Sequence, residues 1–209
     1  MKSVLISGAH STGKTTLLNH LQQVQPKKLS KTPLMFSPEV ARKFMAESGF
    51  NTETQQCKQM MKKINFLILD KQYEREQEME IKMKDLGYNE AICIYDRGVI
   101  DPICYLDMYV GEEAANKALS LSKVKEMITR MRDETQCIVF VIMPQEKFIE
   151  DDGIRVETSG IKELFNYDDI MTSYLDRMGV YYHRILEEDL FDRSEFVQQK
   201  IIERWPQLF

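Results

Sequence analysis

Near its N-terminus the chain reads Val4-Leu5-Ile6-Ser7-Gly8-Ala9-His10-Ser11-Thr12-Gly13-Lys14-Thr15-Thr16. Residues 8–15 match the pattern Gly-x-x-x-x-Gly-Lys-Ser/Thr, in which a glycine-rich loop surrounds phosphate groups. Gly8 and Gly13 allow the backbone to turn tightly and to bring successive amide groups toward an anion. An apolar strand precedes the loop, and a helix with leucines at helical spacing follows it. Because the motif requires this context, the segment predicts a nucleotide phosphate site of the P-loop type.

The side chains of the motif have predicted roles. Lys14 supplies a point charge for the β- and γ-phosphates of a nucleotide, and the Thr15 hydroxyl is placed to ligate Mg²⁺. His10 either points at the phosphates or only fills the loop, and we favour the second interpretation. We therefore expect ATP and Mg²⁺ at a site that comprises Gly8, Ser11, Thr12, Gly13, Lys14, Thr15 and Thr16.

Short apolar runs alternate along the chain with longer stretches of helical period. The runs cover residues 3–7, 34–37, 91–95, 137–143 and 180–186, and the central ones are apolar throughout. This composition is typical of strands covered on both faces, and the alternation is typical of a parallel sheet. We predict an α/β, three-layer P-loop NTPase fold with a central five-stranded parallel sheet and helices on both faces.

Residues 51–86 contain neither Gly nor Pro and are rich in Gln, Glu, Lys and Met. They predict a long helix, broken at most once. Within it, charges of both signs alternate over residues 74–80, which favours a solvated helix face over an interaction tail. The apolar positions of this helix favour core packing, with an interface between copies of the chain as the alternative. The sequence thus leaves open whether the protein forms a homo-oligomer.

The chain has 209 residues, of which 43% are hydrophobic and 29% charged, and its formal net charge is -5. These values predict one globular domain over residues 1–209. The acidic balance argues against broad binding of nucleic acid, with a local basic cleft as the alternative. No apolar run approaches the roughly 20 residues that a membrane helix needs. The apolar segment at the N-terminus is too short for a secretory signal. We expect a cytoplasmic protein without a membrane span or a metal centre held by Cys and His.

Charged residues follow two of the predicted strands at their carboxyl ends, where ligands of open parallel sheets bind. Glu39 and Arg42 follow the second strand, and Asp96, Arg97 and Asp101 follow the third. Asp96 occupies the position of the acidic residue linked to Mg²⁺ in P-loop enzymes, or it acts as the base toward an acceptor hydroxyl, a role for which Glu39 competes. The alternatives are a helix cap or first-turn charge for the carboxylates and a simple pair with Glu39 for Arg42.

A polar segment follows the fourth strand and covers approximately residues 144–160. It contains Asp152-Gly153-Ile154-Arg155. A charged loop with Gly at this position is typical of a lid that closes Arg155 over the transferring phosphate and stabilises its charge. The alternative is a surface loop.

These segments, taken in order, resemble the P-loop kinase-like, AAA-type domains of the group that contains the NadR-type ribosylnicotinamide kinases. The resemblance covers most of the chain and rests on residues 6–17, 39–42, 66–72 and 152–155. It implies a kinase with a movable lid, with ATP and Mg²⁺ on Lys14 and Thr15. The small acceptor is then held near Glu39, Arg42, Gln72 and Asp96.

One segment departs from the ribosylnicotinamide kinases. Asp96-Arg97-Gly98, with Asp101 and Tyr105 after it, is more similar to the Asp-Arg signature of nucleoside and thymidylate kinases. In such kinases the arginine contacts substrate or phosphate, so Arg97 carries over as a binding residue. The identity of the acceptor stays open. We expect the kinase module alone, without an accompanying adenylyltransferase domain.

Near the C-terminus, Asp192-Arg193 follows the last predicted strand. The resemblance places this pair where adenine-proximal loops lie in related kinases, and a solvated helix start is the alternative.

The sequence thus predicts ATP-dependent phosphoryl transfer to a hydroxyl or phosphate of a small nucleoside-, nucleotide- or ribosylnicotinamide-like acceptor. Lys14, Asp96, Glu39 and Arg155 are the predicted catalytic residues, with Thr15 and Asp96 at Mg²⁺. The predicted substrate-binding residues are Glu39, Arg42, Gln72, Arg97 and Asp101. A polynucleotide 5′-hydroxyl kinase is a variant of this hypothesis. A nucleotide-dependent switch without an acceptor is the alternative from another class. No Asn-Lys-x-Asp segment for guanine recognition is present, which favours ATP over GTP.

Overall fold

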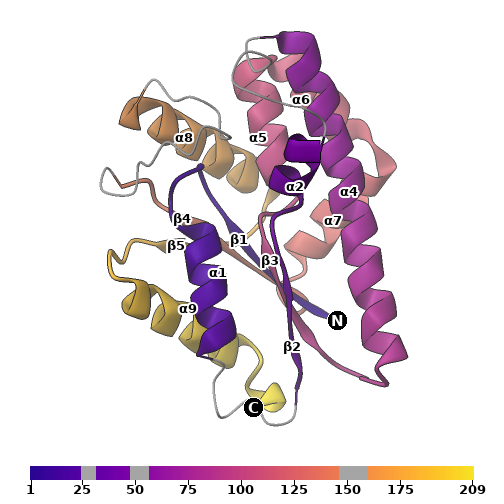
Figure 1. The fold of residues 1–209 in the computed structure, drawn as a ribbon, viewed down its shortest axis with the longest axis vertical. Helices are drawn as coiled ribbons and strands as arrows, with labels where there is room; N and C mark the ends of the chain where they lie inside the picture. Colours follow the sequence, from indigo (N-terminus) through magenta and orange to yellow (C-terminus); the bar gives the residue numbers. More distant parts are fainter. Residues whose placement is uncertain (25–31, 48–56, 146–159) are drawn as a thin grey trace.

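A computed structural model describes residues 1–24, 32–47, 57–145 and 160–209 of the chain. Its centre is a parallel sheet with the order β2-β3-β1-β4-β5 (Figure 1). The strands are β1 (Lys2–Ser7), β2 (Leu34–Ser37), β3 (Ile92–Asp96), β4 (Cys137–Ile142) and β5 (Tyr182–Ile185). All five coincide with the predicted apolar runs, so the predicted fold class is confirmed. The last strand is shorter than predicted, and the third ends one residue later, at Asp96.

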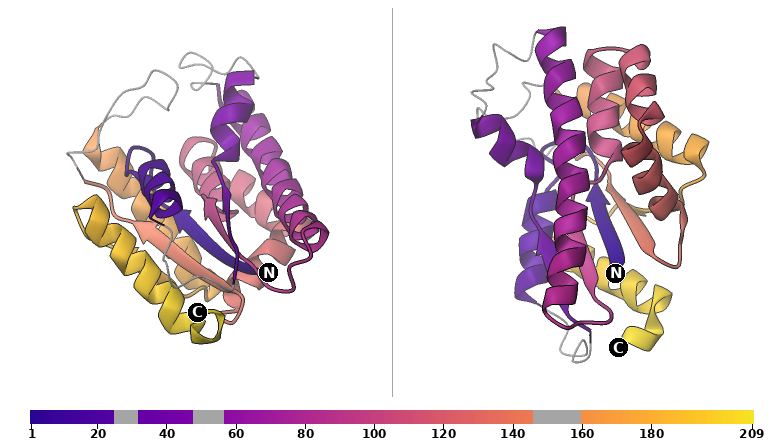
Figure 2. Two further views of the ribbon diagram at one scale, coloured as in Figure 1. Left: turned by 60° about the horizontal axis from the view of Figure 1, so that its bottom comes forward. Right: turned by 90° about the vertical axis from the view of Figure 1, so that its right-hand side faces the viewer.

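The sheet is covered on both faces by helices. These are α1 (Lys14–Gln23), α2 (Val40–Glu47), α4 (Lys58–Asp85), α5 (Ile100–Tyr109), α6 (Glu112–Ser120), α7 (Ser122–Arg132), α8 (Ile161–Met178) and α9 (Leu190–Arg204). The short 3-10 helix η2 (Pro206–Leu208) follows α9. Figure 2 shows α1 and α9 together on one side of the sheet and the larger group with α4 and α5 on the other.

Successive strand residues contribute to two different cores. In β1, Val4 and Ile6 pack with the apolar side chains of α1 and α9, whereas Leu5 packs with those of α4 to α8. Because successive side chains of a strand point to opposite faces, a central strand that is buried on both sides must be apolar throughout. Residues 137–142 of β4 are all buried for the same reason.

The long predicted helix is present as α4, which runs over 28 residues without a break. It buries a row of apolar side chains against the sheet and its neighbours, among them Met61, Leu69, Met79 and Met83. The prediction that residues 74–80 form a solvated face is wrong for Glu76, whose carboxylate pairs with Arg130 of α7 at 2.8 Å. Burial raises the pKa of Glu76 to about 7. Helix α7 packs on α4 and covers Glu76. The order of charged and apolar residues within α4 alone does not predict this contact.

Among the described residues, no helix combines the length and the apolar character that crossing a membrane would require.

Candidate active site

The predicted P-loop connects β1 to α1 at the carboxyl edge of the sheet. Gly8 has φ 135° and Gly13 has φ 86°, both in the left-handed region that favours glycine. A Cβ atom on Gly8 would lie 2.8 Å from the carbonyl oxygen of Ile142 in β4. One on Gly13 would lie 3.1 Å from the Arg193 guanidinium of α9. The loop therefore closes tightly between two neighbouring elements, as phosphate binding by backbone amides requires.

Lys14 begins α1 and is buried inside the loop. Its Nζ donates to the carbonyl oxygen of Ala9 and to Thr12 Oγ1. Burial, together with the positive charge of Arg97, lowers the pKa of Lys14 to about 7. A cavity of about 300 Å³, here called the loop cavity, is lined by Ser11, Gly13, Lys14, Thr15, Thr16, Glu39 and Arg97. An anion in this cavity would meet the ammonium group and the N-terminal end of α1 together.

Thr15 and Asp96 lie side by side below the loop. The Thr15 hydroxyl donates to Asp96 Oδ2 over 2.6 Å, although the two residues belong to α1 and β3. Burial and the nearby charge of Glu39 raise the pKa of Asp96. The second carboxylate oxygen, Oδ1, is buried without a hydrogen-bond partner among the described residues. A hydroxyl and a carboxylate with a spare oxygen suit the ligand preference of Mg²⁺.

Arg97 links the loop to the segment after β2. It has φ 76°, an uncommon conformation for a residue other than glycine. Its Nε donates to Glu39 Oε1 over 2.7 Å, and one terminal nitrogen donates both to Asp101 Oδ1 and to the carbonyl oxygen of Gly8. Three contacts thus stabilise this uncommon backbone conformation, and they hold the guanidinium group between the P-loop and Glu39.

Asp101, predicted to bind substrate, has the surroundings of a residue that orients Arg97. Its carboxylate also accepts hydrogen bonds from the Ser7 hydroxyl, the Gly98 amide and the Tyr167 hydroxyl. The side chain is buried, and its contacts hold the start of α5 against β1. Asp101 borders a large cavity, but these contacts already occupy both of its carboxylate oxygens.

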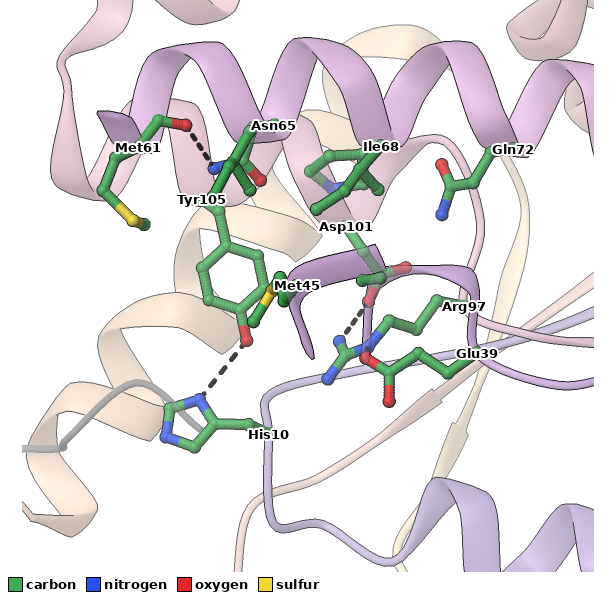
Figure 3. A pocket seen from close by; sticks show the side chains of 13 residues that line it. His10, Glu39, Met45, Met61, Asn65, Ile68, Gln72, Arg97, Asp101 and Tyr105 are labelled. Atoms are coloured by element: carbon green, nitrogen blue, oxygen red, sulfur yellow. Dashed lines mark hydrogen bonds and ion pairs between the residues drawn. The ribbon is translucent and has the colours of Figure 1, made fainter. Parts of the chain in front are cut away.

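This large cavity, here called the α4 cavity, measures about 590 Å³. Figure 3 shows α4 above it with Asn65, Ile68 and Gln72, and Arg97 and Glu39 at one end. Much of its wall is apolar, formed by Ala41, Met45, Met61, Ile64, Ile68 and Pro102. Gln72 is 8% exposed, and its Oε1 has no hydrogen-bond partner among the described residues. The cavity thus combines an apolar wall with an amide oxygen that can accept a hydrogen bond from a ligand.

The two cavities meet at one ion pair. Glu39 and Arg97 line both the loop cavity and the α4 cavity. A group bound in the α4 cavity can therefore approach an anion bound in the loop cavity past these two side chains.

Some predicted residues lie outside this description. Arg155 and residues 146–159 of the predicted lid are outside the described residues, as is the side chain of Arg42. Of the residues that the structure does describe, Glu39, Gln72, Arg97 and Asp101 line one or both of the two cavities. Asp96 lines neither cavity and lies beside Thr15, which lines the loop cavity. Their roles stay predictions.

Two contacts of the site were not predicted. His10, interpreted above as a loop filler, lines the α4 cavity. Arg193 of α9 is buried and donates to the carbonyl oxygen of Thr12 over 2.9 Å, so it supports the P-loop from behind. The charged side chain in the first turn of a helix with an apolar face was the only sign of this contact in the sequence. The sequence did not identify the partner, because Arg193 and Thr12 are 181 positions apart.

Comparisons with known proteins agree with this architecture. A family model described as "AAA domain" matches residues 3–193. A structure of NadR protein in complex with NR is similar with a TM-score of 0.67 and 20% identity, over 97% of this chain and 51% of that one. A NadR structure in complex with NAD and AMP-PNP has a TM-score of 0.64 and 19% identity, over 97% and 49% of the two chains. Shikimate kinase from Acinetobacter baumannii in complex with shikimate is similar with a TM-score of 0.52 and 13% identity, over 97% of this chain and 94% of that one.

The search of curated proteins finds no match. The chain spans about half the length of the NadR structures it matches. Its likeness to these structures lies in the fold, a parallel sheet with a P-loop between β1 and α1. The chain belongs to the AAA domain family.

Proposed function

We propose that this protein transfers the γ-phosphoryl group of ATP to a hydroxyl group of a small nucleoside-like acceptor, a class that includes ribosylnicotinamide. The observation that supports this most directly is the junction of the loop cavity and the α4 cavity at Glu39 and Arg97. A kinase must hold donor phosphate and acceptor hydroxyl in contact, and a pure nucleotide switch needs no second cavity of this kind.

The nucleotide phosphates would lie in the loop cavity. The loop amides and Lys14 bind them, and Arg193 keeps the loop in place from behind. Thr15 and Asp96 would hold Mg²⁺, which neutralises charge on the phosphates during transfer. This arrangement assigns Asp96 to the metal side of the site. It leaves Glu39, which faces both cavities, as the carboxylate that accepts the proton of the acceptor hydroxyl.

The acceptor would lie in the α4 cavity. Its apolar part packs against Met45, Met61 and Ile64, and a hydrogen-bond donor on it meets Gln72 Oε1. Arg97 orients Glu39 and lies close enough to the loop to stabilise charge on the transferring group. The resemblance also assigns Arg42 to the acceptor and Arg155 to a lid that closes over the phosphate. The related NadR structure was solved with NR, which motivates ribosylnicotinamide as one candidate.

A coupled assay of ADP release tests the proposal. Purified protein with ATP and Mg²⁺ is assayed first without acceptor and then with pooled nucleosides, nucleotides and nicotinamide riboside. We expect release that depends on an acceptor, and splitting the pool then identifies it. Release without any acceptor, or tight nucleotide binding without release, would favour the switch. Binding of GTP more tightly than ATP would overturn the assignment of the donor base.

A further inference from the structure

His10 belongs to the P-loop, yet its side chain faces away from the loop cavity. It lines the α4 cavity together with Tyr105, and it is absent from the lining of the loop cavity. The imidazole is 6% exposed, so it forms part of the wall and is not a solvent-facing loop residue. In Figure 3 it lies at the opposite end of the α4 cavity from Gln72.

Tyr105 of α5 fixes the position of His10. The Tyr105 hydroxyl and His10 Nδ1 lie 3.3 Å apart and share a hydrogen bond (Figure 3). Burial raises the pKa of Tyr105 to about 12, so the phenol keeps its proton at neutral pH. Its ring stacks on Tyr109 at 6.0 Å and packs on Tyr167 at 4.7 Å between centroids. These contacts allow the tyrosine little freedom to move.

The His10–Tyr105 pair closes a ring of contacts around the acceptor side of the P-loop. From Gly8, the ring passes through Arg97 to Asp101 by hydrogen bonds. It continues to Tyr167, whose hydroxyl donates to Asp101, and to Tyr105, which packs on Tyr167. Tyr105 then returns the ring to the loop at His10. Both ends of the short segment Gly8–His10 are therefore held by one connected set of side chains, which comprises Arg97 before α5, Asp101 and Tyr105 of α5, and Tyr167 of α8.

We propose that His10 and Tyr105 are specificity-determining residues that recognise a second hydroxyl group on the acceptor, next to the one that is phosphorylated. This inference rests on the proposed kinase function. The reacting hydroxyl must lie near the phosphates, so the part of the acceptor closest to the P-loop is the part that carries it. His10 is a P-loop residue, and it therefore meets that polar part, whereas the apolar part lies against α2 and α4.

The chemistry of the pair suits a neutral hydroxyl. A phenol and an imidazole offer both a donor and an acceptor without a fixed charge. The acceptor is accordingly a polyhydroxylated ring, such as a ribose, and the P-loop takes part in choosing it. A loop filler would instead support the P-loop without discriminating between acceptors.

The experiment measures discrimination between acceptors. Adenosine, uridine and nicotinamide riboside are compared with their 2′-deoxy and 3′-deoxy forms, in wild type, His10→Asn, His10→Ala and Tyr105→Phe. For the wild type we expect kcat/KM to fall by about tenfold when the recognised hydroxyl is absent, as for loss of one or two hydrogen bonds. In the variants we expect that preference to shrink to about twofold or less, with KM for ATP unchanged within about twofold.

Matched controls remove the same chemical groups elsewhere. His183→Ala on β5 and Tyr181→Phe, at a tyrosine that is 53% exposed, lie outside both cavities and should keep the preference. Tyr105→Phe retains the stacked ring, so the comparison survives if His10→Ala fails to fold.

The outcomes separate the two proposals. Retained discrimination in His10→Ala and Tyr105→Phe, or a wild type that turns over deoxy forms equally well, overturns the inference and leaves the kinase function standing. Acceptor-independent ADP release, or none with any acceptor, overturns the kinase function and the inference with it.

Discussion

Lys14 is a buried lysine whose pKa lies well below its usual value of 10.5. Its pKa of about 7 arises from burial and from Arg97, partly offset by Asp96, Asp101 and Glu39. Between these two pH values the unfolded chain therefore binds more protons at this residue than the folded protein does. The contribution of Lys14 to the free energy of unfolding therefore increases as the pH rises from about 7 to 10.5.

Nucleotide binding should reverse this shift. Bound phosphates favour the ammonium form, so above pH 7 the protein takes up a proton when nucleotide binds, and the apparent affinity falls as the pH rises. Calorimetry at pH ~8, in buffers with different ionisation enthalpies, should show uptake approaching one proton per site. Lys14→Arg, which stays charged, should show none. Absence of uptake in the wild type would contradict the lowered pKa.

The proposed roles of Asp96 and Glu39 can be distinguished by the turnover and the Mg²⁺ dependence of their amide variants. Asp96→Asn should keep nucleotide binding and lower turnover by at least about a hundredfold, because Thr15 loses its carboxylate partner at the metal side. Titration with Mg²⁺ should show that this variant needs a higher Mg²⁺ concentration for half-maximal turnover than the wild type does. In Glu39→Gln the dependence on Mg²⁺ should match that of the wild type while turnover falls. Unchanged turnover in Asp96→Asn would reject its role.

At the scale of single elements, α4 combines the wall of the α4 cavity with much of the core on one face of the sheet. Two methionines of this one helix provide a matched pair, since Met79 is 2% exposed and Met60 is 38% exposed. Met79→Ala should lower the free energy of unfolding by about 2–5 kcal/mol, because it leaves a void between α4 and the sheet. Met60→Ala should cost less than about 1 kcal/mol. Urea denaturation followed by circular dichroism measures both, and equal losses would contradict the assigned faces of α4.

For the whole molecule, the proposed transfer requires that water be kept out of the two cavities. The sequence predicts a lid over residues 144–160, whose Arg155 lies outside the described residues. If Arg155 contacts the transferring phosphoryl group, Arg155→Ala should lower kcat by about a hundredfold or more, with KM for ATP little changed. Lys162→Ala, just after this segment in α8, is a control for lost positive charge. A pure loss of ATP affinity in Arg155→Ala would contradict a role in the transition state.

The sequence by itself determined the features that depend on neighbours along the chain. The P-loop, its flanking strand and helix, and the other strands follow from local spacing and from apolar runs that only a doubly covered strand requires. The sequence also places Glu39, Asp96 and Arg97 at the carboxyl edge of the sheet, because each of them lies at the end of a strand or just after it.

Only the tertiary structure decided which of these side chains meet. The strand order β2-β3-β1-β4-β5 places Glu39 beside Arg97 across 58 residues, and His10 beside Tyr105 across 95. The packing of α7 on α4 likewise buries Glu76 beside Arg130, and the packing of α8 on α5 brings Tyr167 to Asp101. Spacing along the chain has no information about such contacts, because they depend on how the helices pack on the sheet after folding. The P-loop is thus a local feature of the chain, whereas the α4 cavity exists only in the packed molecule.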